Sequence, residues 1–181
     1  MKLTSLPEES HHTTAYKCPC CGQTYDELPL CFGSDKPDYY YAIPTDEREK
    51  RIELKESLCV VDEEHFFHRC RLIIPIIDYP EDLIFNVWAS ISEDNFWIRM
   101  DLWGNPNRTQ QNPYFGWLQT LVPTYGETLN IKTLAFEQEV GHIPHIKVVE
   151  ENHALTIDQE KGITYEKALD IVDKILSEAH S

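Results

Sequence analysis

Residues 64–77 "EHFFHRCRLIIPII" and residues 82–91 "DLIFNVWASI" are neighbouring stretches with a clear strand pattern. In the first stretch every second position falls on one face, which carries Phe66, His68, Cys70, Leu72 and Ile74. This alternation is typical of a β-strand, and the second stretch is rich in β-branched and aromatic residues. Between them, residues 78–81 "DYPE" have the composition of a tight turn. The two stretches therefore predict an antiparallel hairpin or meander.

Further strands and helices are expected around this hairpin. The strands are predicted at residues 58–62, 131–139 and 145–151. The helices are predicted at residues 44–57, 92–104 and 163–180, with Thr45, Ser92 and Thr164 as their N-caps. Two aromatic segments are expected to be less regular: an extended loop at residues 26–44 and a part-helical, part-loop stretch at residues 112–130.

Strands in a run, with helices before, between and after them, indicate an α+β fold in one domain. We predict an antiparallel sheet with helices packed on one face, an N-terminal cysteine knuckle at residues 16–31 and a C-terminal amphipathic helix. Residues 1–15 are expected to form a mobile tail, and residues 16–181 the domain. A chain of 181 residues can bury a sufficient core without a metal or disulfide staple.

The composition limits which classes of partner the protein can bind and in which cellular compartment it is expected. The chain has a net charge of −15, whereas a nucleic-acid-binding surface needs clustered lysine and arginine, so a nucleic-acid partner is not expected. The evenly spread negative charge is typical of an ordinary solvated surface; the alternative is an acidic face that docks a basic protein partner. The first residues lack the apolar core of a secretory signal, and the apolar run at residues 72–77 is too short to cross a membrane. We therefore expect a cytoplasmic protein with no membrane partner and with reduced cysteines.

The segment "YKCPCCGQTY", residues 16–25, places three cysteines in four positions. Cys18 and Cys21 form a C-P-x-C-G pattern, in which two thiolates can bind one zinc ion while the glycine relieves the turn. A redox role is disfavoured because no helical pattern follows the first cysteine. A structural zinc site needs four ligands, so Cys20 or Cys31 would supply the third and one of the histidines the fourth. The alternative is a metal-free loop of reduced thiols.

The histidines at H-x-x-H spacing are weaker candidates for a metal site. His65 and His68 would point to opposite faces of a strand, and His142 and His145 lie in a turn. We expect all four to be packed or solvated side chains rather than ligands. The sequence also contains no nucleotide-binding loop and no hydrolase motif.

These observations favour a small acidic binding or regulatory protein over an enzyme. It would dock or neutralise a basic protein partner, and a bound zinc ion would be structural. The alternative is a small enzyme that uses a zinc ion or the Cys70/His68 pair in an aromatic-lined pocket. However, Cys59 and Cys70 lie in apolar strand segments and are expected to be inert core residues.

Several long segments resemble an uncharacterised bacterial family known as domain of unknown function 2199. The resemblance runs from about Tyr16 to the final helix and is carried by "CPCCGQTYDELPL", "DKPDYYYAIP", "LCVVDEEHFFHRC", "NVWASISEDNF", "PYFGWLQTLVPTYGETLNIKT" and "HALTIDQEKGIT". It implies no activity, because the family has none assigned. The family's knuckle has the form C-x-x-C-G-x-x-H, with a histidine where this chain has Tyr25. The resemblance thus carries over Cys18 and Cys21, and Cys20 or Cys31 would have to compensate for the missing histidine.

Overall fold

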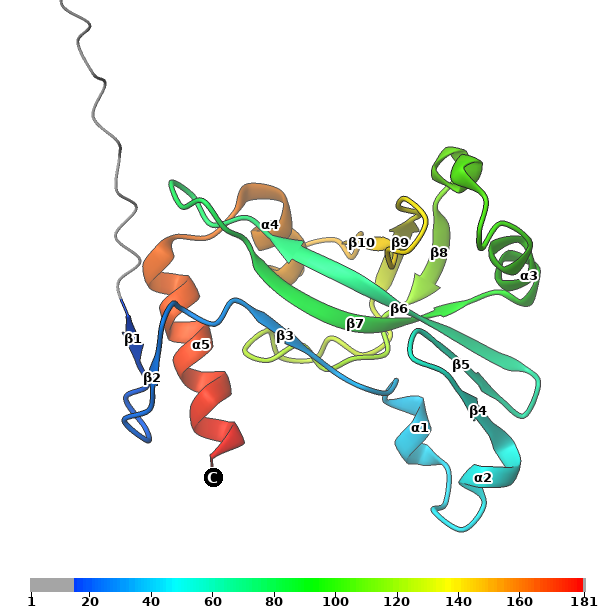
Figure 1. Cartoon of the computed structure of the whole chain (residues 1–181), viewed down its shortest axis with the longest axis horizontal. Helices are drawn as coiled ribbons and strands as arrows, with labels where there is room; N and C mark the ends of the chain where they lie inside the picture. Colours follow the sequence, from blue (N-terminus) through cyan, green and yellow to red (C-terminus); the bar gives the residue numbers. More distant parts are fainter. Residues whose placement is uncertain (1–14, 181) are drawn as a thin grey trace, which may run out of the picture.

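The computed structural model describes residues 15–180, which form a curled β-sheet with helices around it (Figure 1). The strands are β1 (Tyr16–Lys17), β2 (Thr24–Tyr25), β3 (Cys31–Gly33), β4 (Ile52–Leu54), β5 (Leu58–Val61), β6 (His65–Ile74), β7 (Leu83–Ile91), β8 (Tyr114–Trp117), β9 (Lys132–Phe136) and β10 (His145–Val148). The helices are α1 (Tyr39–Ala42), α2 (Arg48–Arg51), α3 (Glu93–Asp101), the 3-10 helix η1 (Pro106–Gln110), α4 (Ala154–Lys161) and α5 (Tyr165–Ala179).

The expected hairpin is confirmed as the pair β6 and β7, which are joined by nine consecutive antiparallel residue pairs. On one face Cys70, Leu72 and Ile74 lie fully buried in the main hydrophobic core. On the opposite face Phe67 belongs to a smaller apolar cluster together with Trp88. Full burial of a large apolar side chain contributes roughly 1.5–3 kcal/mol, so both faces of this hairpin stabilise the fold.

The hairpin is the centre of an eight-stranded sheet with the strand order β3-β7-β6-β10-β9-β8, to which β5 and β4 are added along the first part of β6. Most pairings are antiparallel, but β3 runs parallel to β7 and β10 runs parallel to β6. Both of these strands reach their neighbours through long connections, which a parallel pairing requires. The predicted α+β class and single domain are confirmed, and the sheet is mixed rather than wholly antiparallel.

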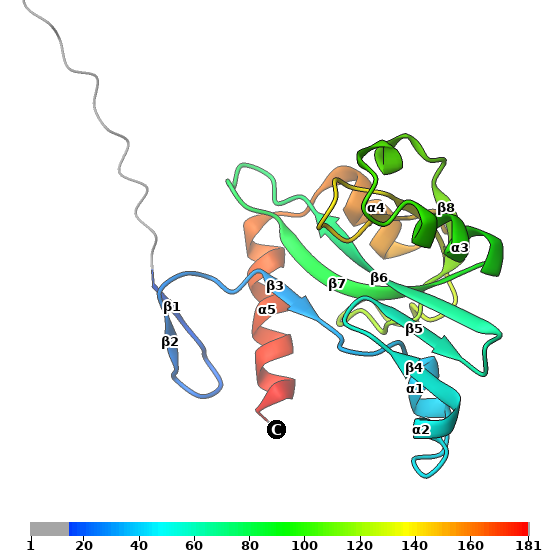
Figure 2. The same cartoon turned by 45° about the vertical axis from the view of Figure 1, so that its right-hand side comes forward.

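The last two helices cover the main core. Leu155 of α4 and Ala168 and Val172 of α5 are buried with the apolar face of β6, and α5 runs alongside the sheet (Figure 2). Thr164 and Ser92 each accept a hydrogen bond from a backbone N–H three residues later, so the expected caps of α5 and α3 are confirmed. These caps satisfy donors that the first helical turn leaves free.

The helix predicted at residues 44–57 is wrong beyond a single turn. Only Arg48–Arg51 is helical, and it begins after Glu47 rather than after a Thr45 cap. Ile52–Leu54 then forms β4, which pairs with β5 and packs partly buried side chains against the smaller apolar cluster. An isolated short helix with few apolar residues is only marginally stable, so the strand pairing prevails.

Four other elements differ from the sequence-based expectation. The segment 26–44 contains β3 and the turn-long α1, and the segment 112–130 contains β8. α4 was not predicted, because its apolar residues do not share one face: Leu155 is buried and Ile157 is exposed. The position of each element depends on contacts with residues that are distant in the chain, and local sequence patterns contain no information on such contacts.

The expected N-terminal tail, residues 1–15, falls outside the described residues except for its last position. Between residues 15 and 180, no helix has the length and apolar character that spanning a membrane requires.

Gly116 marks the place where the curled sheet meets itself. β8 returns to the end of β7, where Ala89 and Leu118 form an isolated antiparallel bridge. Gln119 N–H donates to the Trp88 carbonyl at 2.7 Å. A Cβ atom on Gly116 would lie 1.9 Å from the backbone oxygen of Ser90, so the position admits only glycine.

Gly116→Ala is expected to lower the free energy of unfolding by about 3 kcal/mol, because the clash involves backbone that cannot rotate away. Urea denaturation monitored by tryptophan fluorescence measures this change. Gly104→Ala is the matched control, since a Cβ there meets nothing within 4 Å. Equal stability of the two variants would contradict the close approach of β8 and β7.

Candidate metal centre

The cysteine knuckle lies in the turn of a small hairpin. β1 and β2 pair antiparallel, with Tyr16 opposite Tyr25, and the cysteines occupy the connection between them. The Cys18 N–H donates to the Gln23 carbonyl at 2.8 Å, and the Gly22 N–H donates to the Cys18 carbonyl at 2.9 Å. Gly22 has φ of +74°, a left-handed conformation that favours glycine. The turn expected from the C-P-x-C-G pattern is therefore present.

This turn brings three thiols to a histidine from the other end of the chain. One ligand atom each from Cys18, Cys20, Cys21 and His180 lies within 4.8 Å of all the others. Cys18 Sγ and Cys20 Sγ are 2.9 Å apart, and Cys20 Sγ lies 3.6 Å from Nδ1 of His180. Cys18 is buried, whereas the other three side chains are exposed. The group forms a shallow site with one interior ligand.

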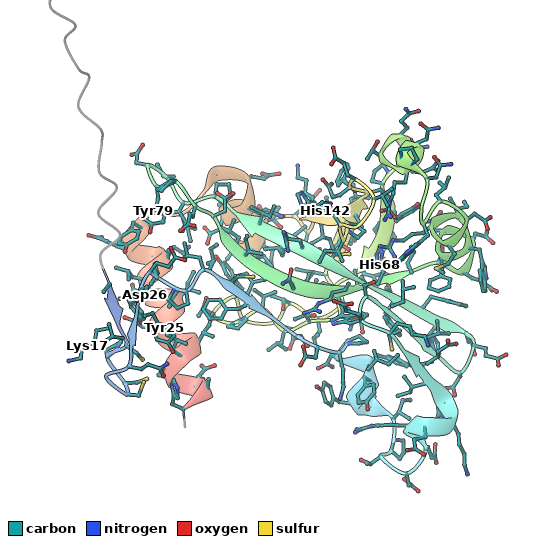
Figure 3. The ribbon with its side chains drawn as sticks, in the orientation of Figure 1. Lys17, Tyr25, Asp26, His68, Tyr79 and His142 are labelled. Carbon is teal, nitrogen blue, oxygen red and sulfur yellow. The ribbon has the colours of Figure 1, made fainter. Side chains whose placement is uncertain are left out.

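The position of α5 explains why His180 reaches the knuckle. The Tyr16 hydroxyl donates a hydrogen bond to the Asp173 carboxylate, which attaches β1 to the middle of the helix. Burial and this hydrogen bond raise the pKa of Tyr16, so the hydroxyl remains a donor. His180 follows the last residue of α5, and its Nδ1 lies 2.7 Å from the Leu176 carbonyl one turn earlier. Figure 3 shows Tyr25 of the hairpin beside α5.

The thiols influence one another's protonation. A hydrogen bond from Cys20 stabilises the Cys18 thiolate and lowers the pKa of Cys18 to about 7. The same contact raises the pKa of Cys20 to about 11, because Cys20 keeps the proton that it donates. A divalent cation would replace this shared proton, since metal ligands must be deprotonated.

Three thiolates and one imidazole match the ligand preferences of zinc. Structural zinc sites are four-coordinate and tetrahedral, and Cys3His is one of their common ligand sets. The four residues could therefore hold such an ion with no further ligand. Cys18 and Cys21 were expected from the sequence, Cys20 was one of two alternatives for the third ligand, and the fourth was expected to be an unspecified histidine.

Cys31, the other alternative for the third ligand, lies outside this group. It is the first residue of β3, and its Sγ accepts a weak hydrogen bond from Nδ2 of Asn86 at 3.7 Å. Tyr25, where the family resemblance implies a histidine, stacks near Tyr16 with 6.0 Å between ring centroids. No feature of the sequence singles out His180, because it lies 159 positions after Cys21.

The alternative catalytic pair, Cys70 and His68, is buried in the core. Burial raises the pKa of the Cys70 thiol, and burial followed by the nearby Arg99 charge lowers the pKa of His68 well below its usual value. The Cys70 Sγ contacts the backbone carbonyl of His68 at 3.8 Å rather than the imidazole. Cys59 is also buried, with its pKa raised to about 11 by desolvation. The expectation that these two cysteines are core residues is confirmed.

The structure also shows where the remaining histidines at H-x-x-H spacing lie. His65 packs on Tyr39, with 5.0 Å between ring centroids, and so does not share a site with the buried His68. His142 and His145 line a cavity on the other side of β6 from the main core. Within residues 15–180, neither pair belongs to a group that could hold a metal ion.

Fold and site together define a small α+β protein with an N-terminal cysteine knuckle closed by a C-terminal histidine. The chain belongs to the DUF2199 family, described as an uncharacterized protein conserved in bacteria, which matches residues 17–163. This match includes the three knuckle cysteines and ends before α5, so His180 lies outside it. Searches of curated proteins and of solved structures give no significant match.

Thiol titration of native protein stripped of metal at pH 7 should separate exposed from buried cysteines. Cys20, Cys21 and Cys31 are exposed and should react, whereas Cys59 and Cys70 should react only after unfolding. Peptide mass spectrometry after a short alkylation pulse assigns each site, and denatured protein provides the control in which all six react. Rapid labelling of Cys70 in the native protein would contradict its assignment as an inert core thiol and would support the catalytic Cys70/His68 alternative.

Proposed function

We propose that this chain is a cytoplasmic binding or regulatory protein whose N-terminal knuckle holds a structural zinc ion. The observation that carries the proposal is the convergence of Cys18, Cys20, Cys21 and His180 within 4.8 Å. Two ends of the chain supply these residues, and no other described region of the protein gathers three such groups.

A structural role suits this donor set better than a catalytic one. Four protein ligands complete a tetrahedral shell and leave no open position for water or substrate. When bound, the ion would supply a cross-link between the β1–β2 hairpin and the end of α5. The hairpin has only two residue pairs of its own, and such short hairpins are marginal in water. The Tyr16–Asp173 hydrogen bond and the cross-link would hold it together.

Loss of one ligand should remove the zinc and loosen the hairpin while the main core stays folded. Elemental analysis of protein purified without chelator should give about one zinc per chain, and Cys18→Ser or His180→Ala should lower this by at least about tenfold. Hydrogen exchange should then accelerate at residues 16–25 but not in β6 and β7, since local opening does not require global unfolding.

Cys31→Ser is the matched control for this experiment, because Cys31 is an exposed cysteine outside the cluster. It should keep the zinc content and exchange rates of the parent. The proposal fails if the parent contains no zinc after metal supplementation, or if Cys31→Ser loses zinc as readily as Cys18→Ser.

The binding role rests on the distribution of charge. The chain has 31 acidic and 16 basic residues, yet four of its six arginines line an inner cavity rather than the outer surface. The outer surface is therefore more acidic than the net charge of −15 indicates. At the turn between β5 and β6, Glu63 and Glu64 are exposed and form no ion pair with any residue from 15 to 180. Such a surface attracts basic protein partners.

Association with a basic cytoplasmic protein should weaken steeply as salt rises from about 0.05 to about 0.5 M, because the Debye length shortens. Reversing charge in Glu63→Lys/Glu64→Lys should lower the affinity by about tenfold. Glu166→Lys/Asp170→Lys changes the net charge equally on α5, at the opposite end of the molecule, and should have less effect (Figure 1). Salt-insensitive binding, or equal losses in both variants, would contradict the acidic docking site.

A further inference from the structure

A cavity of about 390 Å³ lies where β6 changes its neighbour in the sheet. The first part of β6 pairs with β5, and the last residue pair there is Leu58 with His68. From Arg71 onward β6 pairs with β10 instead, and the first residue pair there is His145 with Arg71. At this fork the Arg69 N–H donates to the Ser57 carbonyl, and the Arg71 N–H donates to the Pro144 carbonyl. Because β5 and β10 diverge here, side chains from several elements can meet in the gap.

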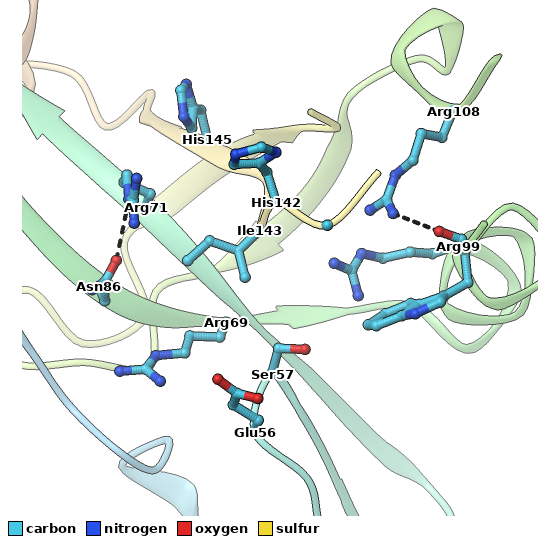
Figure 4. A pocket seen from close by; sticks show the side chains of 12 residues that line it. Glu56, Ser57, Arg69, Arg71, Asn86, Arg99, Arg108, His142, Ile143 and His145 are labelled. Atoms are coloured by element: carbon cyan, nitrogen blue, oxygen red, sulfur yellow. Dashed lines mark hydrogen bonds between the residues drawn. The ribbon is translucent and has the colours of Figure 1, made fainter. Parts of the chain in front are cut away.

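Four arginines line this cavity (Figure 4): Arg69 and Arg71 from β6, Arg99 from α3 and Arg108 from η1. They are four of the six arginines in a chain whose net charge is −15. The nearby carboxylates are Glu56 at the rim and Glu137, which forms ion pairs with Arg99 and Arg108. Two carboxylates against four guanidinium groups leave a charge of +2. Such an excess is unfavourable at close quarters unless an anion compensates it.

Arg99 is buried and only partly compensated. It is 1% exposed, and its Nε lies 2.8 Å from Oε1 of Glu137. Its Nη1 is buried and has no hydrogen-bond partner in the described part of the chain. A buried guanidinium donor without an acceptor is energetically unfavourable. An oxyanion in the cavity would give this donor an acceptor, because the Arg99 side chain points into it (Figure 4).

Arg108 and Arg71 are held in place by other contacts. Arg108 donates to the Trp103 carbonyl at 2.9 Å and to the Glu137 carboxylate, so its guanidinium is fixed. Arg71 Nε lies 3.4 Å from Oδ1 of its cross-strand neighbour Asn86. The Trp103 ring lies 5.0 Å from the guanidinium carbon of Arg99. The cationic groups are thus preorganised, which lowers the cost of binding an anion.

The permanent cationic charge of the cavity resides on the arginines, because a guanidinium group stays protonated in proteins. Desolvation, followed by the neighbouring Arg71 and His142, lowers the pKa of His145 and disfavours its protonated form. Ser57 and Ile143 complete the wall with a hydroxyl and an apolar side chain. The cavity is therefore polar on the arginine side and partly apolar opposite.

We propose that this cavity is the binding site for a phosphorylated small molecule. A phosphate monoester carries close to two negative charges and three acceptor oxygens, which match the +2 excess and the guanidinium groups from opposite walls. A planar carboxylate can form two parallel hydrogen bonds with one guanidinium group, but it leaves the arginines on the opposite wall of the cavity without an acceptor. A volume of about 390 Å³ exceeds the needs of phosphate alone and suits a ligand with a small organic part against Trp103 and Ile143.

Isothermal titration calorimetry with inorganic phosphate, ribose 5-phosphate, ribose and citrate tests the proposal. Inorganic phosphate and ribose 5-phosphate should bind with one-to-one stoichiometry, and ribose should not bind. Arg69→Gln and Arg71→Gln should each weaken phosphate binding by about ten- to hundredfold, as loss of a charge-assisted hydrogen bond predicts. Both residues are only partly buried, so these variants should fold, whereas Arg99→Gln would leave Glu137 with one partner.

Arg51→Gln is the matched control, since it removes one guanidinium from α2, where Arg51 pairs with Glu47 and Asp62 outside the cavity. Its phosphate affinity should stay within about twofold of the parent. The indole N–H resonance of Trp103, assigned with Trp103→Phe, should shift on binding because the ring adjoins Arg99. Absence of saturable phosphate binding, an equal loss in Arg51→Gln, or tighter binding of citrate than of either phosphate compound would overturn the proposal.

Discussion

The pairing of β6 with β7 positions most of the other strands and the last two helices. Nine consecutive residue pairs fix the register of this hairpin, and alternate residues of β6 point into two separate apolar clusters. A shift of one residue would exchange the two faces and expose Leu72 and Ile74, so the register is strongly determined. β3, β5 and β10 all attach to this hairpin, and α4 and α5 pack on one of its faces.

The same hairpin separates the two candidate sites. The knuckle lies beside α5 and joins the two ends of the described chain, while the arginine-lined cavity lies at the fork between β5 and β10. The two sites share no residue. A cross-link in the knuckle would therefore stabilise the N-terminal hairpin, whereas an anion in the cavity would relieve repulsion among arginines held by β6, α3 and η1. Their chemistry also differs, since one site uses soft sulfur ligands and the other hard oxygen acceptors.

Much of the fold could be predicted because local patterns and tertiary contacts agree there. Period-two alternation identified β6 and β7, and Ser92 and Thr164 act as the expected caps. β4 was missed because its polar sequence is typical of an exposed helix, yet its two apolar residues gain contacts with the smaller cluster when paired with β5. β8 was missed because its position depends on the close approach at Gly116, which involves the distant Ser90 backbone. In both cases long-range pairing prevails over local propensity.

The α+β class, the central hairpin, the last helix and the cysteine knuckle could be predicted from local patterns, because each is encoded by residues that are near one another in the chain. The apolar strand segments around Cys59 and Cys70 also predicted that both are core residues, although the Cys70/His68 pair remained as the catalytic alternative. Tertiary folding places Cys20 rather than Cys31 in the knuckle and brings His180 to the group. It alone gathered Arg69, Arg71, Arg99 and Arg108 around one cavity. These residues come from different elements, and their proximity depends on packing that no local pattern contains.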